Sequence, residues 1–120
     1  MVWIYNQASG ELTRAGKFVE IGYSGHGDGK NKPSMQDKAS IGPTPKGTYT
    51  FSAPFTHPHS GRYTMRLHPQ TGTNTFGRSG FMIHGDSIRH PGEASEGCVI
   101  MSIKTRTQMW ESGDHTLVVQ

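Results

Sequence analysis

The 120-residue chain is poor in cysteine, in long hydrophobic runs and in clustered charge, and each scarcity excludes a class of protein. Its single cysteine, Cys98, cannot form an internal disulfide, so the fold does not depend on an oxidising compartment. No apolar run approaches the ~18 residues that a membrane-spanning helix needs, so we expect no membrane insertion. The first residues lack the basic and apolar segments of a secretory signal peptide. We therefore expect synthesis in the cytoplasm and export only by a route that the sequence does not display.

Binding motifs for nucleic acids and metals are also missing. The formal net charge is +3, but the basic residues are scattered and no aromatic residues interleave with them, so we expect no nucleic-acid partner. Seven histidines suggest a zinc hypothesis, in which His57 and His59 are joined by His68 or His84. Neither a His-Glu-x-x-His segment nor a paired-cysteine motif is present. We therefore predict no metal and no cofactor.

Glycine and proline are abundant, with 16 and 7 residues, and short alternating apolar segments recur between them. This composition favours a small, loop-rich, mainly β fold, and the length suits one domain over residues 1–120. We expect strands at 2–5, 11–14, 17–23, 48–51, 63–67, 80–84 and 116–119, and loops at 24–33 and 56–61. The first two strands should form a hairpin.

One short helix is predicted near the C-terminus. Ser102 is a suitable N-cap, and Gly113 would end the helix. Ile103, Thr107 and Trp110 fall at helical spacing, which predicts that they share one face.

The chemistry points to Cys98, which ends the sequence Ser-Glu-Gly-Cys and follows His84 by fourteen positions. A lone cysteine after a glycine, with a histidine upstream on a predicted strand, is the layout of a nucleophile and its general base. The alternative from pattern alone is a buried cysteine that acts as a small hydrophobic residue.

The neighbours of these two residues suit the same reaction. Gly97 removes side-chain bulk, so that the backbone N–H groups of Gly97 and Cys98 are candidate donors to an oxyanion. Ser95 and Asp86 are short polar groups suited to orient the imidazole or to hold the turn. Gly85 allows another backbone to approach closely.

Three segments carry a resemblance to a known family. His84-Gly85, followed by Ser95-x-Gly97-Cys98 and apolar residues, resembles the active-site signature of the YkuD-type L,D-transpeptidases. The sequence GPTPKGTY at 42–49 is similar to the Thr-Pro segment of that fold, and GRSGFMIHGD at 77–86 resembles the branch of type VI secretion effectors with an L,D-transpeptidase-like domain. Glu96 stands where the larger family usually has histidine, which favours the effector branch.

The resemblance implies a small L,D-transpeptidase-like β-sandwich or barrel with one short helix, in which Cys98 is the nucleophile and His84 the base. The implied substrate is the tetrapeptide stem of peptidoglycan, attacked between its diamino acid and its terminal D-alanine. Water would then give L,D-carboxypeptidase activity, and an amine would give L,D-transpeptidase exchange. Arg78, Gly85 and Asp86 are the expected substrate-binding residues, with Arg78 meeting a stem-peptide carboxylate as a bidentate fork.

A periplasmic substrate without a signal peptide predicts a secreted antibacterial toxin, delivered by type VI secretion into the periplasm of target bacteria. An immunity protein in the producer's periplasm is then the expected partner. Two other interpretations stay open: a catalytically inactive cell-wall-binding module and a zinc-dependent murein peptidase.

Overall fold

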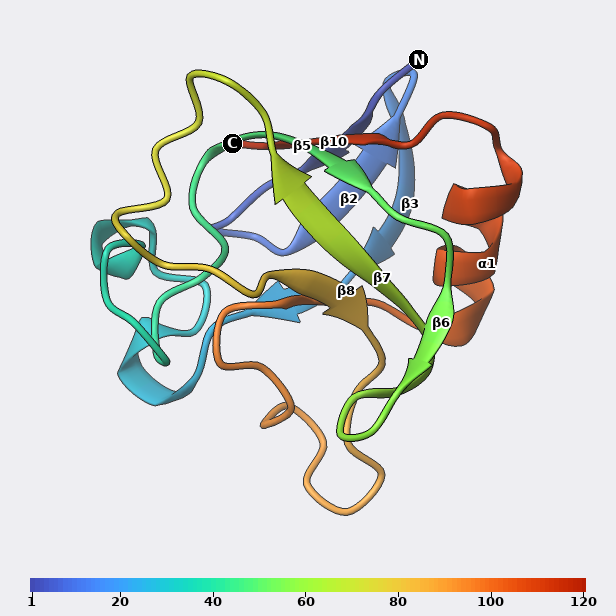
Figure 1. Ribbon diagram of the computed structural model, residues 1–120. Coiled ribbons are helices and arrows are strands. Elements are labelled where there is room, and N and C mark those ends of the chain that lie inside the picture. The colour runs from blue at the N-terminus through green and yellow to red at the C-terminus, as the bar shows by residue number, and fades with distance from the viewer.

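The computed structural model describes residues 1–120 and shows a mixed β-sheet with one α-helix, as expected for a mainly β protein (Figure 1). The strands are β1 (Trp3–Tyr5), β2 (Glu11–Arg14), β3 (Lys17–Ile21), β4 (Tyr23–Ser24), β5 (Gly47–Phe51), β6 (Phe55–His57), β7 (Gly61–Pro69), β8 (Met82–His84), β9 (Val99–Ile100) and β10 (Thr116–Val119). They pair in the order β3-β2-β1-β10-β5-β7-β8-β9-β4, with β6 beside β7. The pairs β1–β10 and β8–β9 are parallel, and the others are antiparallel.

The core is built by alternation along the strands. In β5, Tyr49 and Phe51 are buried while Thr48 and Thr50, which alternate with them, are half-buried, and in β10 Leu117 and Val119 follow the same rule. Leu117 lies opposite Tyr49 in the register, so the two strands bury one shared face. Trp3 in β1 is fully buried in the same cluster. The predicted hairpin of β1 and β2 is confirmed.

The single helix, α1 (Ile103–Glu111), has the predicted bounds because its end signals are local. The Ser102 hydroxyl accepts a hydrogen bond from the Thr105 N–H at 3.3 Å, as an N-cap does. The face that Ile103, Thr107 and Trp110 were predicted to share is not the buried one: Ile103 is exposed and the other two are half-buried. The side chains that α1 buries are Thr105, Arg106 and Met109. No helix has the length and hydropathy needed to cross a membrane.

Three other expectations need correction. The predicted strand 17–23 breaks at Gly22, because the chain passes there from the edge beside β2 to the edge beside β9; a side chain at Gly22 would meet the Ile100 carbonyl oxygen at 1.9 Å. The predicted loop 24–33 contains a 3₁₀ turn, Gly27–Gly29, and a second turn, Pro33–Met35, begins at its end. The predicted loop 56–61 begins inside β6, which pairs with β7 in an irregular register.

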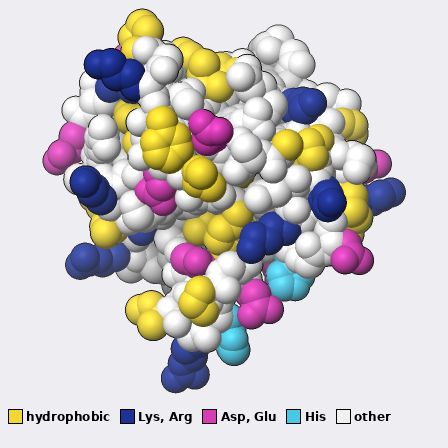
Figure 2. Space-filling model, turned by 180° about the vertical axis from the view of Figure 1, so that it is seen from behind, with side chains coloured by type: hydrophobic (Ala, Val, Ile, Leu, Met, Phe, Trp, Pro, Cys, Tyr) yellow, Lys and Arg dark blue, Asp and Glu magenta, His cyan; other side chains and the backbone are white.

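Charged side chains of both signs are spread over the surface. On the face shown in Figure 2, Lys and Arg side chains are interspersed with Asp and Glu side chains, and neither sign gathers into one patch. The loop that joins β8 to β9 projects from the body of the molecule (Figure 1). This loop separates the two segments that carry the predicted nucleophile and base.

Candidate active site

Strands β8 and β9 bring His84 and Cys98 to one face of the sheet. Ile83 pairs with Val99 and His84 with Ile100, and the core contains Ile83 and Val99. Since side chains alternate along a strand, His84 points away from this core, and so does Cys98, which immediately precedes β9. The predicted base, at the end of β8, and the predicted nucleophile, just before the parallel strand β9, therefore lie on the same face.

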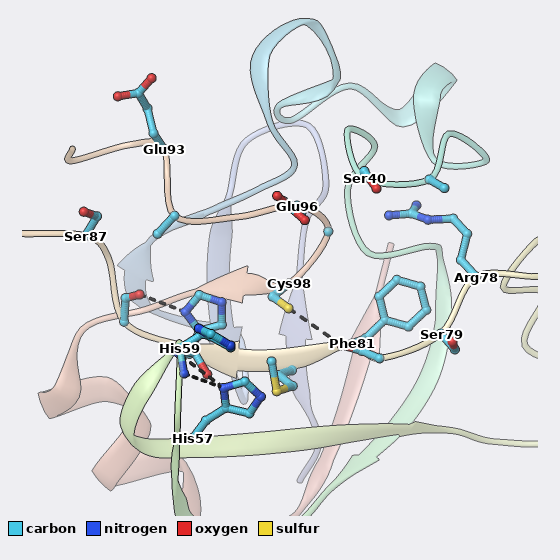
Figure 3. A pocket seen from close by; sticks show the side chains of 18 of the residues that line it. Ser40, His57, His59, Arg78, Ser79, Phe81, Ser87, Glu93, Glu96 and Cys98 are labelled. Atoms are coloured by element: carbon cyan, nitrogen blue, oxygen red, sulfur yellow. Dashed lines mark hydrogen bonds between the residues drawn. The ribbon is translucent and has the colours of Figure 1, made fainter. Parts of the chain in front are cut away.

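Both residues open into a cavity of about 890 Å³, within the range of small-molecule sites. The β8–β9 loop, the segment before β8 and the turn after β6 contribute its walls. In Figure 3, Cys98 lies centrally, with Arg78 on one side, His57 and His59 on the other, and Glu96 above.

His84 is held in the tautomer that a general base requires. Its Nδ1 lies 2.9 Å from the Gly85 carbonyl oxygen, which can only accept, so Nδ1 carries the proton and Nε2 keeps its lone pair. The side chain is 5 % exposed. Burial lowers the pKa of His84; the bond to Gly85 opposes this shift, and the nearby Arg106 guanidinium adds to it. The imidazole is thus neutral near pH 7.

Cys98 is held as a thiol. Burial raises its pKa to about 11, the Met82 N–H and the Arg78 guanidinium oppose the rise, and the Glu96 carboxylate adds to it. No hydrogen bond joins Cys98 to His84; the thiol lies 3.9 Å from the Gly80 carbonyl oxygen. The resting site therefore contains a neutral thiol and a neutral imidazole, and the proton must leave sulfur during attack on a carbonyl.

Ser95 organises the backbone just before the nucleophile. This fully buried hydroxyl accepts from the Gly25 N–H at 2.9 Å and from the Gly97 N–H at 3.1 Å, and donates to the Cys98 carbonyl at 2.7 Å. The Gly97 N–H, predicted as an oxyanion donor, is thus already engaged. The Cys98 N–H donates to no protein atom and is the amide left for that role.

Comparison with known proteins places the chain in a family. Neither the solved structures nor the curated proteins gave a match. The model of the Tlde1 domain, however, matches residues 19–119, which include both His84 and Cys98. The chain belongs to the Tlde1 domain family. By its name, this is a family of type VI secretion effectors with L,D-transpeptidase-like activity, which agrees with the resemblance of residues 77–86 to the effector branch.

Arg78 of this Tlde1 domain lines the cavity, but its guanidinium is already in use. Nη1 donates to the carbonyls of Gln36 and Pro43 at 2.5 and 2.9 Å, and Nη2 donates to the Gly42 carbonyl at 3.0 Å. These three bonds use three of the five guanidinium N–H groups, so a substrate carboxylate would have to bind through Nε–H and the second Nη2–H or displace one of these bonds. As the structure stands, Arg78 fixes the segment before β5 and places a positive charge near Cys98.

Gly85 and Asp86 also border the cavity, with structural contacts of their own. A Cβ at Gly85 would lie 2.7 Å from Arg106 Nη2. Gly85 therefore allows the Arg106 side chain to approach closely, and not another backbone as the sequence predicted. Asp86 accepts from the Tyr23 hydroxyl at 2.5 Å and from the Ser87 and Gly92 N–H groups. Partial burial raises the pKa of Asp86, but these hydrogen bonds outweigh burial and hold that pKa below its usual value. Asp86 thus organises the β8–β9 loop.

The histidines do not assemble a metal site in this domain. His57 and His59 border the cavity, whereas His68 is exposed on β7. No three His, Cys, Asp or Glu side chains lie close enough together to hold a metal ion. The geometry gives the zinc hypothesis no support.

Sequence reasoning missed three residues that support the site. Ser24 and Thr44 are fully buried hydroxyls that bond to the Gly97 carbonyl, and Arg106 lies beneath Gly85. Thr44 lies in the Thr-Pro segment that carried the resemblance, so it had a signal in the sequence. Ser24 and Arg106 had none.

Proposed function

We propose that this Tlde1 domain, as a single domain over residues 1–120, is a cysteine-dependent enzyme that acts on the tetrapeptide stem of peptidoglycan. The observation that carries the proposal is the placement of His84 at the end of β8 and of Cys98 just before the adjacent strand β9, both in the wall of the cavity. Membership of the Tlde1 family supports the choice of substrate.

The reaction begins when Cys98 Sγ attacks the carbonyl carbon between the diamino acid and the terminal D-alanine. His84 Nε2 takes the thiol proton as the S–C bond forms, and the Cys98 N–H faces the developing oxyanion. The imidazolium then gives its proton to the amine of D-alanine as the C–N bond breaks, which leaves a thioester on Cys98.

The thioester is resolved by a second attack, in which neutral His84 again accepts a proton. Water yields the tripeptide stem and a free thiol, which is L,D-carboxypeptidase activity. The amine of another D-amino acid yields an exchanged stem, which is L,D-transpeptidase activity. The charged imidazole exists only during each step, because burial disfavours it.

Such an enzyme needs access to the periplasm, and the family name supports delivery into target bacteria by type VI secretion. An antibacterial activity against D-alanine-terminated stems would also threaten the producer. We therefore include a periplasmic immunity protein among the proposed partners.

The test is incubation of purified murein sacculi with the wild type, Cys98→Ala, His84→Asn and the matched control His26→Asn, whose side chain is exposed outside the cavity. Released D-alanine and stem composition are measured, with and without an added D-amino acid. We expect release by the wild type and the control, none by Cys98→Ala, and a loss of about 10²-fold or more for His84→Asn. Equal release by Cys98→Ala would refute the thiol mechanism.

The raised pKa of Cys98 favours one alternative, a wall-binding module without catalysis. Such a module would co-sediment with sacculi as wild type and as Cys98→Ala, and neither would release D-alanine. The same incubation, with the pellet assayed for protein, distinguishes the two functions.

A further inference from the structure

The carbonyl of Gly97 is bonded by two buried side chains from distant parts of the chain. Thr44 Oγ1 donates to this oxygen, and Ser24 Oγ lies 3.3 Å from it. The two hydroxyls are 3.3 Å apart, and Ser24 Oγ accepts from the Thr44 N–H at 2.9 Å. Both side chains are 0 % exposed, so water does not compete for the Gly97 carbonyl.

This pair of bonds fixes the direction of the next N–H. The peptide between Gly97 and Cys98 is trans, so its C=O and N–H point in opposite directions. With the carbonyl directed at the buried hydroxyls, the Cys98 N–H points away from them, and both residues line the cavity. The Cys98 N–H makes no hydrogen bond within the protein.

The direction needs to be held because Gly97 has no side chain to restrict its own backbone. Its φ of +139° lies in a region that glycine enters at little cost. If the Gly97–Cys98 peptide rotated, a carbonyl oxygen would face the developing oxyanion in place of an N–H. Ser95 cannot prevent this rotation alone, since it holds the Gly97 N–H and the Cys98 carbonyl, which belong to the peptides on either side.

We infer that Thr44 and Ser24 are positioning residues that keep the Cys98 N–H turned toward the oxyanion of the acylation step. The inference rests on the proposed function, because it assigns these hydroxyls a role in that reaction. Thr44, in the Thr-Pro segment before β5, therefore acts through the Gly97 carbonyl without touching the substrate.

The test compares Thr44→Val, which loses the hydroxyl at nearly constant shape, with Thr44→Ser, which keeps it. Both variants retain the backbone contacts of Thr44 with Ser24 Oγ and with Gln7 Nε2. A third variant, Ser24→Ala, removes the second donor. D-alanine release gives kcat and KM, and alkylation of Cys98 by iodoacetamide at one alkaline pH reports the thiol without needing an oxyanion donor.

Loss of an oxyanion donor typically lowers kcat by about 10²–10³-fold. We expect kcat of Thr44→Val to fall by at least about tenfold and by at most about 10²–10³-fold. Its KM and its alkylation rate should stay within about twofold of the wild type. The kcat of Ser24→Ala should fall less than that of Thr44→Val, since Thr44 still bonds to the Gly97 carbonyl. Thr44→Ser should restore most of kcat.

Three outcomes overturn the inference while leaving the proposed function in place: an unchanged kcat in Thr44→Val, equal losses in Thr44→Val and Thr44→Ser, or a parallel fall in the alkylation rate, which indicates collapse of the site. A wild type that releases no D-alanine refutes the proposed function itself, and the inference falls with it. A crystal structure of Thr44→Val with the Gly97 carbonyl unmoved would contradict the positioning role independently of activity.

Discussion

Arg106 and Gly85 make a pair whose energetic coupling can be predicted from the structure. Arg106 is 6 % exposed; its Nε donates to the Met101 carbonyl at 3.0 Å, and its Nη1 donates to the carbonyls of Arg62 and Tyr63 at 3.0 and 2.9 Å. The guanidinium thereby ties α1 to β7. Its other terminal nitrogen occupies the space beside Gly85, 2.7 Å from where a Cβ would stand.

Two substitutions test this arrangement. Gly85→Ala introduces a methyl group against a buried cation whose position is fixed by hydrogen bonds, and overpacking of this kind costs about 1–3 kcal/mol. Arg106→Met keeps part of the side-chain bulk but leaves backbone carbonyls unpaired, which costs about 2–4 kcal/mol for hydrogen bonds to a charged group. Gly85 does not have a positive φ, so once the guanidinium is gone the alanine should fit and stabilise the fold by about 0.4–1 kcal/mol through the unfolded chain.

The expected coupling between the two substitutions is therefore about 2 kcal/mol, with Gly85→Ala changing from destabilising to neutral or stabilising in the Arg106→Met background. Urea unfolding of the wild type, both single variants and the double variant measures it, since sites without contact add to within about 0.5 kcal/mol. Gly16→Ala is the control, because it meets no atom within 4 Å and should cost the same in both backgrounds. Additive costs for Gly85→Ala and Arg106→Met would refute the proposed contact.

Further predictions concern the active site. The base must be neutral, and burial holds the pKa of His84 below 6.5. The value of kcat/KM for D-alanine release should therefore stay high as the pH falls to that pKa, and then drop about tenfold per pH unit. An acid limb centred above pH 6.5 would contradict this prediction. Glu96→Gln removes a charge that raises the pKa of Cys98, so the pH profile of iodoacetamide alkylation should move to lower pH, with a gain under about tenfold at fixed pH because Glu96 is exposed. Gly97→Ala places a side chain at a φ of +139°, with its Cβ 2.5 Å from Arg78 Nη2. It should lower the free energy of unfolding in urea by about 1–3 kcal/mol and abolish D-alanine release. An unchanged midpoint of urea unfolding would argue against the strain.

The parts of the fold that the sequence predicted well depend on local signals. The bounds of α1 follow from the cap at Ser102 and the stop near Gly113, both readable from neighbouring residues. The residues that α1 buries were not predicted, because periodicity counts apolar residues and two of the three buried side chains, Thr105 and Arg106, are polar. Arg106 is buried because its guanidinium bonds to distant carbonyls. The break at Gly22 likewise depends on the approach of Ile100, some eighty residues away in the chain.

The same division applies to the candidate site. Cys98 and His84 were predicted from residue type and spacing, and the register of β8 and β9 places them on one face. Which amide faces the cavity was beyond the sequence, because it depends on hydroxyls that other segments supply. A pattern of glycine before cysteine cannot tell a Gly97 N–H bonded to Ser95 from a free one.

The electrostatics of the site suggest why such a thiol is selective. Because burial raises the pKa of Cys98 to about 11, the thiol stays protonated at neutral pH, so simple electrophiles should react with it slowly. Deprotonation of the thiol becomes favourable when a bound amide displaces water from the site. The proton then moves to His84 Nε2 while negative charge moves from sulfur to an oxygen facing the Cys98 N–H. Base and amide must then act in the same step, because neither stabilises a resting thiolate. Slow alkylation at neutral pH together with rapid D-alanine release is therefore the combination expected of this enzyme, and fast alkylation at neutral pH would contradict this account of the site.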